Sequence, residues 1–179
     1  MHITVVARDQ LELRDRNQLA ALNTAVYPPG KNADSPERQV TWAPTEVSVM
    51  ARMDPEGDIV AHAGVLVRDG LLDDVPVRIG GIGGVKSHPA LRARQLGRAV
   101  MARAAELLRD DLEVDFGLLV CPAGVIGFYE RLGWKVFHGT LLAEQPDGRI
   151  EFTLNQPMVL PARLDPPSTG VIDLQGLPW

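Results

Sequence analysis

Apolar and polar positions divide the first half of the chain into short strands and one helix. Residues 2–8, 47–53, 59–67 and 75–87 are β-rich, and clusters of Asp, Pro and Gly separate the last three of them. Apolar residues between 9 and 26 keep helical spacing, Asp9 and Glu12 resemble a capping box, and Pro28 ends the helix. The last three segments therefore predict an antiparallel meander that follows a strand and a helix.

The second half mixes both periods. Residues 95–109 have an apolar face at helical spacing, and the apolar run 115–120 suits a central strand. A strand, helix and strand in this order predict a parallel pair with a right-handed crossover. A second helix begins near Pro122 and ends at Gly133, and residues 134–142 and 150–159 are expected to form an antiparallel hairpin. A strand at 171–174 completes one mixed α/β domain over 1–179, with 161–179 as a tail that packs on it or on a partner.

Residues 83–100 form the stretch with the clearest chemistry. An apolar strand leads through Pro89 into a turn rich in arginine and glycine, and this turn opens a helix. A helix N-terminus offers free N–H groups and partial positive charge, which suits a phosphate. Arg92, Arg94 and Arg98 surround that position, so a phosphate-bearing ligand is expected there. The stretch fits neither the nucleotide P-loop nor the dinucleotide fingerprint.

Composition narrows the classes of function only a little. The 179 residues are 45% hydrophobic and 23% charged, which is ordinary for a globular domain, and the net charge of −5 argues against nucleic acid. That charge is compatible with an amine substrate. Cys121 is the single cysteine, so we expect no intrachain disulfide and no metal site built from cysteines. We see no signal-peptide core and no apolar run of membrane-spanning length, and we expect a cytoplasmic protein without a membrane partner.

A second motif gives the first stretch a family context. Residues 127–134 read Gly-Phe-Tyr-Glu-Arg-Leu-Gly-Trp, an aromatic helix that ends at a glycine before a strand. Together the two motifs resemble the GNAT superfamily of acetyl-CoA-dependent N-acetyltransferases, over about residues 45–160. That family's pyrophosphate loop reads Arg/Gln-x-x-Gly-x-Gly/Ala. Here Arg92 and Gly97 agree with it, and Gln95 replaces the central glycine. A non-glycine is tolerable at that position if its backbone stays helical and its side chain points outward.

Two narrower resemblances concern the acceptor. Residues 58–65 and the terminal Trp179 are similar to aminoglycoside 2′-N-acetyltransferases, whereas residues 41–43 and 170–173 are similar to nodulation acyltransferases, which acylate an amino-sugar oligomer. Gly83 stands where the aminoglycoside enzymes carry an acid, and a polyamine sugar needs acidic partners. Several acidic side chains are candidates to face the acceptor or to be ordinary surface charges: Asp34, Glu46, Asp147, Glu151 and Asp173.

The resemblance implies a mixed, mostly antiparallel sheet whose parallel pair splays around acetyl-CoA. The implied cofactor-binding residues are Val85, Lys86, Ser87, Arg92, Ala93, Arg94, Gln95, Leu96, Gly97 and Arg98. The implied substrate-binding residues are Trp42, Gly83, Gly84, Asp147 and Trp179, and Trp42 is also interpretable as a core lid. No metal is implied. Tyr129 would be the general acid, because a phenol with a pKa near 10 is protonated at neutral pH.

Several alternatives stay open from the residues alone. The base could be Glu46, His62, His88 or a water chain, and His62 is also interpretable as a core histidine. A covalent role for Cys121 would need a partner base. The main hypothesis is acetyl transfer to a primary amine of a small molecule, including an amino sugar or aminoglycoside. The rivals are a longer-chain acyltransferase on an amino sugar and a CoA-binding sensor without turnover, and a homodimer is possible in each case.

Overall fold

The computed structural model describes residues 1–30 and 34–179, without the side chains of residues 92–94. The first half contains β1 (His2–Ala7), α1 (Leu13–Val26), β2 (Val47–Arg52), β3 (Ile59–Leu72) and β4 (Val75–Ser87). The second half contains α2 (Leu96–Glu106), β5 (Phe116–Cys121), α3 (Ile126–Glu130), β6 (Lys135–Val136), β7 (Thr140–Gln145), β8 (Gly148–Glu151), β9 (Gln156–Pro161) and β10 (Val171–Asp173). Short 3₁₀ turns at Arg8–Gln10, Pro36–Arg38, Pro89–Arg94 and Ala123–Val125 join some of them.

Within the described residues the strands form one mixed sheet. Its main path runs β6-β9-β5-β4-β3-β10-β7-β8, and β2 joins β3 on the one side and β1 on the other. Most neighbours are antiparallel, and the pairs β4–β5 and β10–β7 are parallel. The predicted meander β2-β3-β4 and the parallel pair β4–β5 are both confirmed. The two strand–turn–strand connections are short, as their Asp, Pro and Gly residues predicted.

The parallel pair opens partway along its length. β4 and β5 are paired only from Ile79 to Gly81 on β4, opposite Phe116 to Leu118. Beyond that point β5 continues along β9, while β4 continues along β3 to Ser87. The far end of β4 therefore keeps an edge that β5 does not cover. This is the splay around the cofactor that the family resemblance implied.

A bulge distorts β4 at the same place. The register of β3 with β4 shifts between the pairs His62–Lys86 and Gly64–Gly83, which gives β4 one extra residue. Gly84 lies in this bulge with φ +59°, a backbone conformation that glycine adopts without the strain of a side chain. The bulge re-aims the strand just before the helix that carries the arginines.

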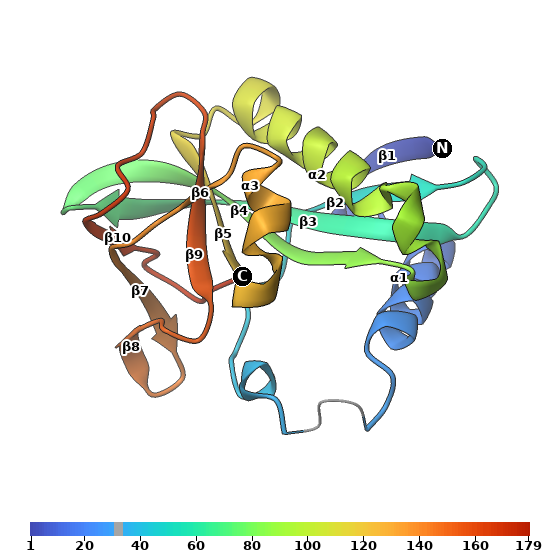
Figure 1. Cartoon of the computed structure of the whole chain (residues 1–179), viewed down its shortest axis with the longest axis horizontal. Helices are drawn as coiled ribbons and strands as arrows, with labels where there is room; N and C mark the ends of the chain where they lie inside the picture. The colour runs from blue at the N-terminus through green and yellow to red at the C-terminus, as the bar shows by residue number, and fades with distance from the viewer. Residues whose placement is uncertain (31–33) are drawn as a thin grey trace.

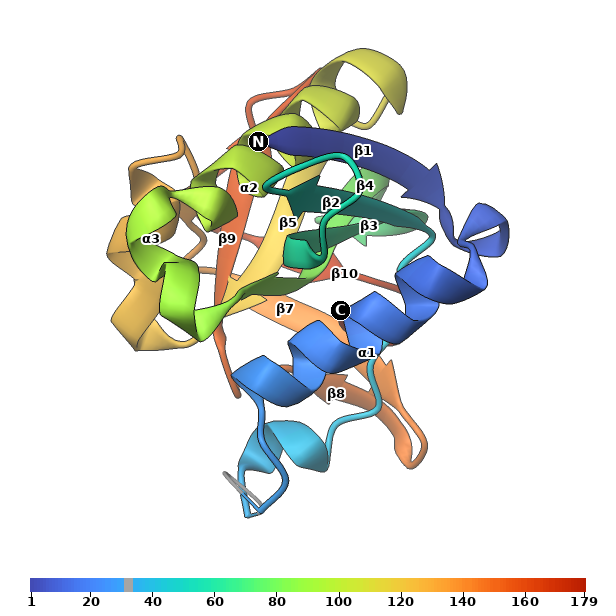
Figure 2. The same ribbon diagram turned by 90° about the vertical axis from the view of Figure 1, so that its right-hand side faces the viewer.

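Helices cover the two faces of the sheet separately. Figures 1 and 2 show α2 above the strands and α1 on the opposite side. From α2, Leu96, Val100 and Ala104 enter a large apolar core with β2, β3 and β5. From α1, Leu22 packs with Met50 and Ile59 in a smaller core. Burial of these apolar stripes holds each helix to its face.

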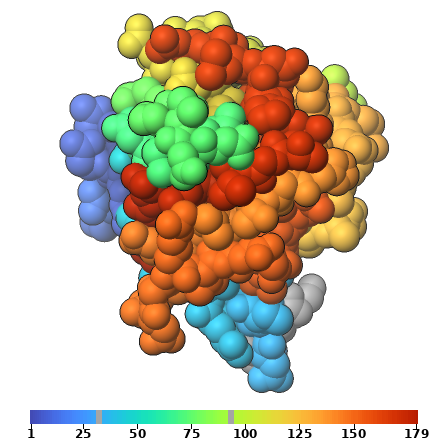
Figure 3. Space-filling view, turned by 90° about the vertical axis from the view of Figure 1, so that its left-hand side faces the viewer, coloured from blue at the N-terminus to red at the C-terminus, as the bar shows by residue number. Residues whose placement is uncertain are grey.

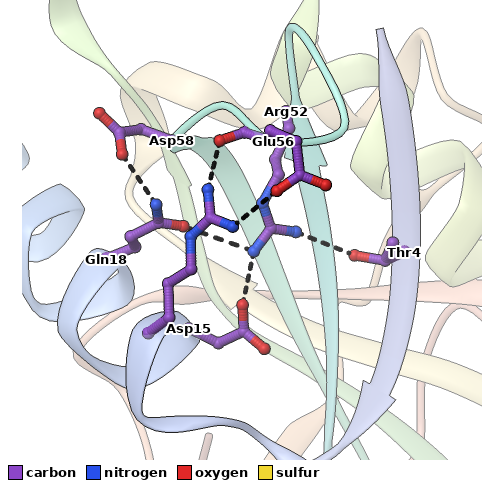
Figure 4. A network of polar contacts seen from close by, with 7 residues as sticks. Thr4, Asp15, Gln18, Arg52, Glu56 and Asp58 are labelled. Carbon is purple, nitrogen blue, oxygen red and sulfur yellow. Dashed lines mark hydrogen bonds and ion pairs between the residues drawn. The ribbon is translucent and has the colours of Figure 1, made fainter.

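A polar network fixes the N-terminal part of α1 to the strands (Figure 4). Arg52 on β2 donates to the carboxylate of Asp15 at 2.6 Å, and both side chains are largely buried. The same guanidinium reaches Thr4 on β1 at 3.3 Å and Gln18 at 3.4 Å. Gln18 in turn donates to Asp58 at 2.8 Å, in the turn before β3. The network therefore ties helix, strand and hairpin together.

Three details of the expected elements are wrong. The first helix begins at Leu13 without a side-chain cap, and Asp9 lies in a separate 3₁₀ turn, so no capping box forms. The helix expected over 95–109 ends at Glu106 and continues as one π-helical turn to Asp111. The hairpin expected from residues 134–142 and 150–159 forms only in part. β7 and β8 pair antiparallel across the turn at Pro146 and Asp147, as expected, whereas β6 pairs with β9.

The last residues cross the sheet as β10 and then return toward its centre. β10 lies between β3 and β7, antiparallel to the first and parallel to the second. Figure 3 shows these residues between the tip of the β3–β4 hairpin and the β7–β8 hairpin. The Trp179 indole is buried and donates to Leu118 O at 3.0 Å. Among the described helices, none has the length and apolar character needed to span a membrane.

Candidate functional site

A cleft of about 1050 Å³ lies where β4 and β5 diverge. Its walls come from the bulged end of β4, the end of β5, α3, and the connection between α1 and β2. The predicted residues that line it are Trp42, Gly83, Gly84, Val85, Lys86, Tyr129 and Trp179. Ser87, Gln95, Leu96, Gly97 and Arg98 lie past the end of this wall, at the approach to α2 and in its first turn. Asp147 is exposed in the β7–β8 turn and does not line the cleft.

The start of α2 has the features of an anion site. Ala99 is the first α2 residue whose N–H reaches a carbonyl of this turn, that of Gln95 at 3.1 Å. The N–H groups of Leu96, Gly97 and Arg98 thus have no partner inside the helix. A Cβ on Gly97 would lie 3.0 Å from Ser87 Oγ, so glycine lets the helix approach the strand closely. Leu96 is buried and contributes through its backbone. The side chains of Arg92, Ala93 and Arg94 lie outside the described residues.

Gln95 departs from the expected backbone geometry. Its φ of +54° and ψ of +25° are left-handed, and the residue caps α2 from outside the helix. The expectation that a non-glycine there stays helical is therefore wrong. The exposed side chain does point away from the core, as expected. Gln95 thus adopts a conformation that favours glycine, at a cost in backbone strain.

His62 is joined to the bulge of β4. Its Nδ1 donates to the carbonyl of Gly84 at 2.9 Å, and its Nε2 accepts from Ser48 Oγ at 3.3 Å. Burial lowers the pKa of His62 to about 4, the Gly84 hydrogen bond opposes that effect, and the Lys86 charge adds to it. The imidazole is therefore neutral at pH 7 and links β2, β3 and β4 at the cleft wall.

Tyr129 is buried at the end of α3 with its side chain on the cleft. Phe128 and Trp134 pack edge-on against it, with ring centroids 5.0 and 6.5 Å away. Burial raises the pKa of the Tyr129 phenol, and the neighbouring Cys121 and Tyr27 raise it further. The hydroxyl is therefore protonated at every pH near neutrality, and it can donate a proton but is a poor base.

Cys121 lies at the end of β5, beside the cleft. Its Sγ is 3.6 Å from Met158 Sδ, and burial raises the pKa of the thiol to about 11. A thiol with this pKa is not a thiolate at neutral pH, so it lacks the form that attacks a thioester. A covalent role for Cys121 would therefore require a partner base that removes the thiol proton.

Trp179 explains two glycines of β4. A Cβ on Gly81 would lie 2.3 Å from the indole ring, and one on Gly83 would lie 3.0 Å from the Trp179 backbone. The space beside Gly83, where a side chain would lie, is thus filled by the backbone of Trp179. Gly83 is the position at which the resemblance to aminoglycoside enzymes implied an acid. Arg68 holds the same segment, with its guanidinium 5.2 Å from the indole centroid and a hydrogen bond to Leu177 O.

Trp42 combines the two roles that the sequence left open. Its ring meets Phe152 edge-on at 5.8 Å between centroids, and its Nε1 donates to Glu37 O at 2.9 Å. The half-buried residue also lines the cleft. It therefore anchors the α1–β2 connection to the core and forms part of the cleft wall.

None of the acids considered for the acceptor lines the cleft. Glu46 accepts from Val67 N at 3.3 Å, and Asp173 is buried in an ion pair of 2.7 Å with Arg149. Asp34 and Glu151 are exposed. The acidic residue that does line the cleft, within the described chain, is Glu37. No group of three His, Cys, Asp or Glu side chains suited to a metal occurs in the described residues.

Sequence reasoning missed the cleft residues that precede Trp42 in the chain. Arg8, Asn23, Tyr27, Glu37 and Arg38 line the cleft from α1 and the segments that flank it. They carry no motif, and helical spacing identifies the buried face of α1 but not the face that meets a cleft. Only the topology, which brings α1 beside the end of β4, indicates their position.

Three solved structures with a similar fold are described as acetyltransferases or acyltransferases. YhbS, a GNAT family N-acetyltransferase from Escherichia coli in complex with CoA, is 15% identical with a TM-score of 0.62, over 97% of this chain and 88% of that one. A GNAT family acetyltransferase from Brucella melitensis in complex with acetyl-CoA is 16% identical with a TM-score of 0.57, over 96% and 94%. An acyl-CoA N-acyltransferase from Pseudomonas aeruginosa is 19% identical with a TM-score of 0.58, over 89% and 98%.

The structural similarity to these proteins shows the fold, and the expected GNAT acyl-CoA N-acyltransferase fold is confirmed. No curated protein sequence matches the chain. A protein family does match it, the nodulation protein A (NodA) family, over residues 1–155. This match covers most of the sheet, both long helices and all of the cleft residues except those in the tail. The chain belongs to the nodulation protein A (NodA) family.

Proposed function

We propose that the protein is an acyl-CoA-dependent N-acyltransferase that moves acetyl from acetyl-CoA to a primary amine of a small molecule. The carrying observation is the cleft between the splayed strands, which the bulge of β4 and the phenol of Tyr129 line together. The fold neighbours include GNAT proteins in complex with acetyl-CoA and with CoA, which supports the donor.

The residues at the splay fit such a donor. The uncovered edge of β4 at Val85 to Ser87 offers backbone groups for the pantetheine arm, and the free N–H groups of Leu96, Gly97 and Arg98 suit the pyrophosphate. The exposed Arg98 adds a positive charge at that end. The donor supplies an acyl group activated as a thioester. Backbone N–H groups of the bulged strand would stabilise negative charge that develops on its carbonyl oxygen.

Tyr129 is the proposed general acid. The neutral amine attacks the carbonyl carbon, the new C–N bond forms, and the C–S bond breaks. The Tyr129 hydroxyl then gives its proton to the departing sulfur, which its raised pKa permits because the phenol stays protonated. His62 makes a poor base, since its two ring nitrogens are hydrogen-bonded and its pKa is about 4. We assign the amine proton to water in the open cleft.

A second candidate within the same chemistry is a longer acyl chain transferred to an amino sugar. The family match favours it, because the resemblance to nodulation acyltransferases concerns enzymes that acylate an amino-sugar oligomer. A cleft of about 1050 Å³ has room for a sugar. An aminoglycoside acceptor, the third possibility, has less support. Such a polyamine needs several acidic partners, and among the described residues Glu37 is the one acid that lines the cleft.

The test is thiol release from acetyl-CoA and from longer acyl-CoA donors with a panel of amines: amino sugars, aminoglycosides, polyamines and amino acids. CoA should also raise the melting temperature, because a ligand that binds only the native state stabilises it. Tyr129→Phe should lower kcat by about 10²-fold and leave the CoA-induced shift unchanged. An unchanged kcat would remove Tyr129 from the mechanism. Stabilisation by CoA without thiol release from any pair would favour the sensor alternative.

A further inference from the structure

The cleft carries positive charge although the whole chain is acidic. The charged side chains that line it, among the described residues, are Arg8, Arg38 and Lys86 against Glu37. The acidic residues that give the whole chain its net charge of −5 therefore lie mostly outside the cleft. Because charge in a cleft of low dielectric acts more strongly than charge on an open surface, this local excess decides which ligands enter.

Lys86 is a half-buried cation without an acid to balance it. It stands opposite His62 in the register of β3 with β4, on the wall that the bulge forms. The described residues provide it with no ion pair or side-chain hydrogen bond, and the adjacent imidazole is neutral. Burial lowers the pKa of the Lys86 ammonium, and no carboxylate offsets that effect. A buried charge in such a position is stabilised when an anion binds beside it.

A recess of about 200 Å³ extends the cleft under α1 at this point. Arg8, Thr45, His62 and Lys86 line the recess and the cleft alike, so the two are continuous. The remaining walls are Ser48 and the apolar Leu11, Leu19 and Leu22. Arg8 supplies a second cation at the recess, and the described residues include no acid paired with its guanidinium. The recess thus combines two unbalanced cations, two hydroxyls and an apolar wall.

We propose that this recess binds an anionic group of the acceptor, so that the acceptor is a primary amine that also carries a carboxylate or phosphate. Lys86 and Arg8 hold the anion, and the hydroxyl of Thr45 adds a hydrogen bond at the recess wall. The amine is thereby directed toward the splay between β4 and β5. This inference rests on the proposed N-acyltransferase function and narrows its acceptor class. It disfavours polycationic acceptors, whose charges Lys86 and Arg8 repel.

The experiment compares acceptors that share a carbon skeleton and differ in an anionic group, with kcat/KM expressed for the neutral form of each amine. Leucine is paired with leucinamide, and glucosamine 6-phosphate with glucosamine, each with a saturating acyl-CoA donor. At least one anionic member should have a kcat/KM about tenfold or more above its neutral partner, since charge-assisted hydrogen bonds are worth at least this factor. The member preferred distinguishes a carboxylate from a phosphate.

Variants assign the preference to the recess. Lys86→Met and Arg8→Met should each remove most of the advantage of the anionic acceptor. Arg8→Met should also change kcat/KM for the neutral acceptor less than threefold. Lys135→Met and Arg14→Met are matched controls, because these side chains are exposed and ion-paired to Asp165 and Glu56 away from the cleft. Arg8→Glu, at an exposed position that tolerates the change, should shift preference to the neutral acceptor.

Two results would overturn the proposal. One is a wild-type enzyme that uses neutral or polycationic amines as well as anionic ones, and the other is an equal loss for both members of a pair in the Lys86 and Arg8 variants. Thermal shifts separate this failure from failure of the proposed function. If no amine is acylated, leucine or glucosamine 6-phosphate should still stabilise wild type more than the Lys86→Met variant, and the absence of that difference refutes the anion site itself.

Discussion

The buried histidine at the cleft makes the stability of the protein depend on pH. His62 has an ordinary pKa of 6.5 when unfolded and a pKa of about 4 when folded, with burial as the main cause. Between these values the unfolded chain binds a proton that the folded chain does not. The contribution of the neutral His62 to the free energy of unfolding is therefore fully present above pH 6.5 and is lost as the pH falls from 6.5 toward 4.

The size of the effect follows from those two values. The two pKa values differ by 2.5 units, and each unit corresponds to 1.36 kcal/mol, so His62 lowers the free energy of unfolding by about 3 kcal/mol below pH 4. The same two pKa values give a loss of about 2 kcal/mol already at pH 5. This is a sizeable part of the 5 to 15 kcal/mol by which domains are usually stable. The 7% exposure of the side chain leaves little solvent screening to reduce it.

The assay is urea unfolding of wild type and of His62→Gln from pH 8 to pH 5. Gln can still donate to Gly84 O, but it does not titrate, so subtracting its free energy of unfolding at each pH isolates the histidine. The wild-type protein should lose about 2 kcal/mol more than the variant between pH 8 and pH 5. Parallel profiles for the two proteins would show that His62 does not titrate as its burial implies, and the neutral-imidazole argument for the cleft would fail with it.

Three other substitutions test packing and backbone geometry. Gly81→Ala places a Cβ 2.3 Å from the Trp179 ring, so it should cost about 2 to 3 kcal/mol in urea unfolding and red-shift tryptophan fluorescence. Asp15→Asn leaves Arg52 without its anion and should cost about 2 kcal/mol, less than for a fully buried pair because Asp15 is 16% exposed. Gln95→Gly relieves a left-handed φ of +54° and should raise stability by up to about 1 kcal/mol.

Each of these has a matched control. Gly124→Ala meets no atom within 4 Å of the new Cβ and should be neutral within about 0.5 kcal/mol. Glu56→Gln removes an exposed ion pair with Arg14 and should also cost little. Gln95→Ala keeps the left-handed backbone and should bring no gain. A Gly81→Ala protein as stable as wild type would mean that Trp179 does not occupy the position described.

The elements that periodicity predicts best are those whose burial is local. The strand over 75–87 was expected with the bounds that β4 has, and the crossover from β4 through α2 to β5 gives the parallel pair. The paired motifs around Gly97 and Tyr129 predicted a fold that the solved neighbours confirm. The cofactor and substrate residues named from those motifs remain predictions, although six of them line one cleft together with Tyr129.

What the sequence could not indicate depends on contacts between distant segments. Strand pairing past residue 134 depends on which of several strands becomes the partner of β7. β7 pairs with β10, whereas β9 pairs with β5. The charge of the cleft is a similar case. Arg8 and Lys86 are 78 positions apart in the sequence and meet at the cleft because α1 crosses the sheet there. Neither composition nor a motif reveals such a pairing of charges, whereas topology does.

The insertion of β10 between β3 and β7 also constrains the order of folding. Along the sheet described, the β7–β8 hairpin is hydrogen-bonded to the central strands through β10. Residues 140–151 are synthesised before Val171 to Asp173, the three residues that attach them to the central strands. Until then one flank of the nascent sheet carries an open edge, which is a site for non-native strand pairing. During synthesis, closure of this edge by β10 is a late event that joins two separately formed parts of the sheet.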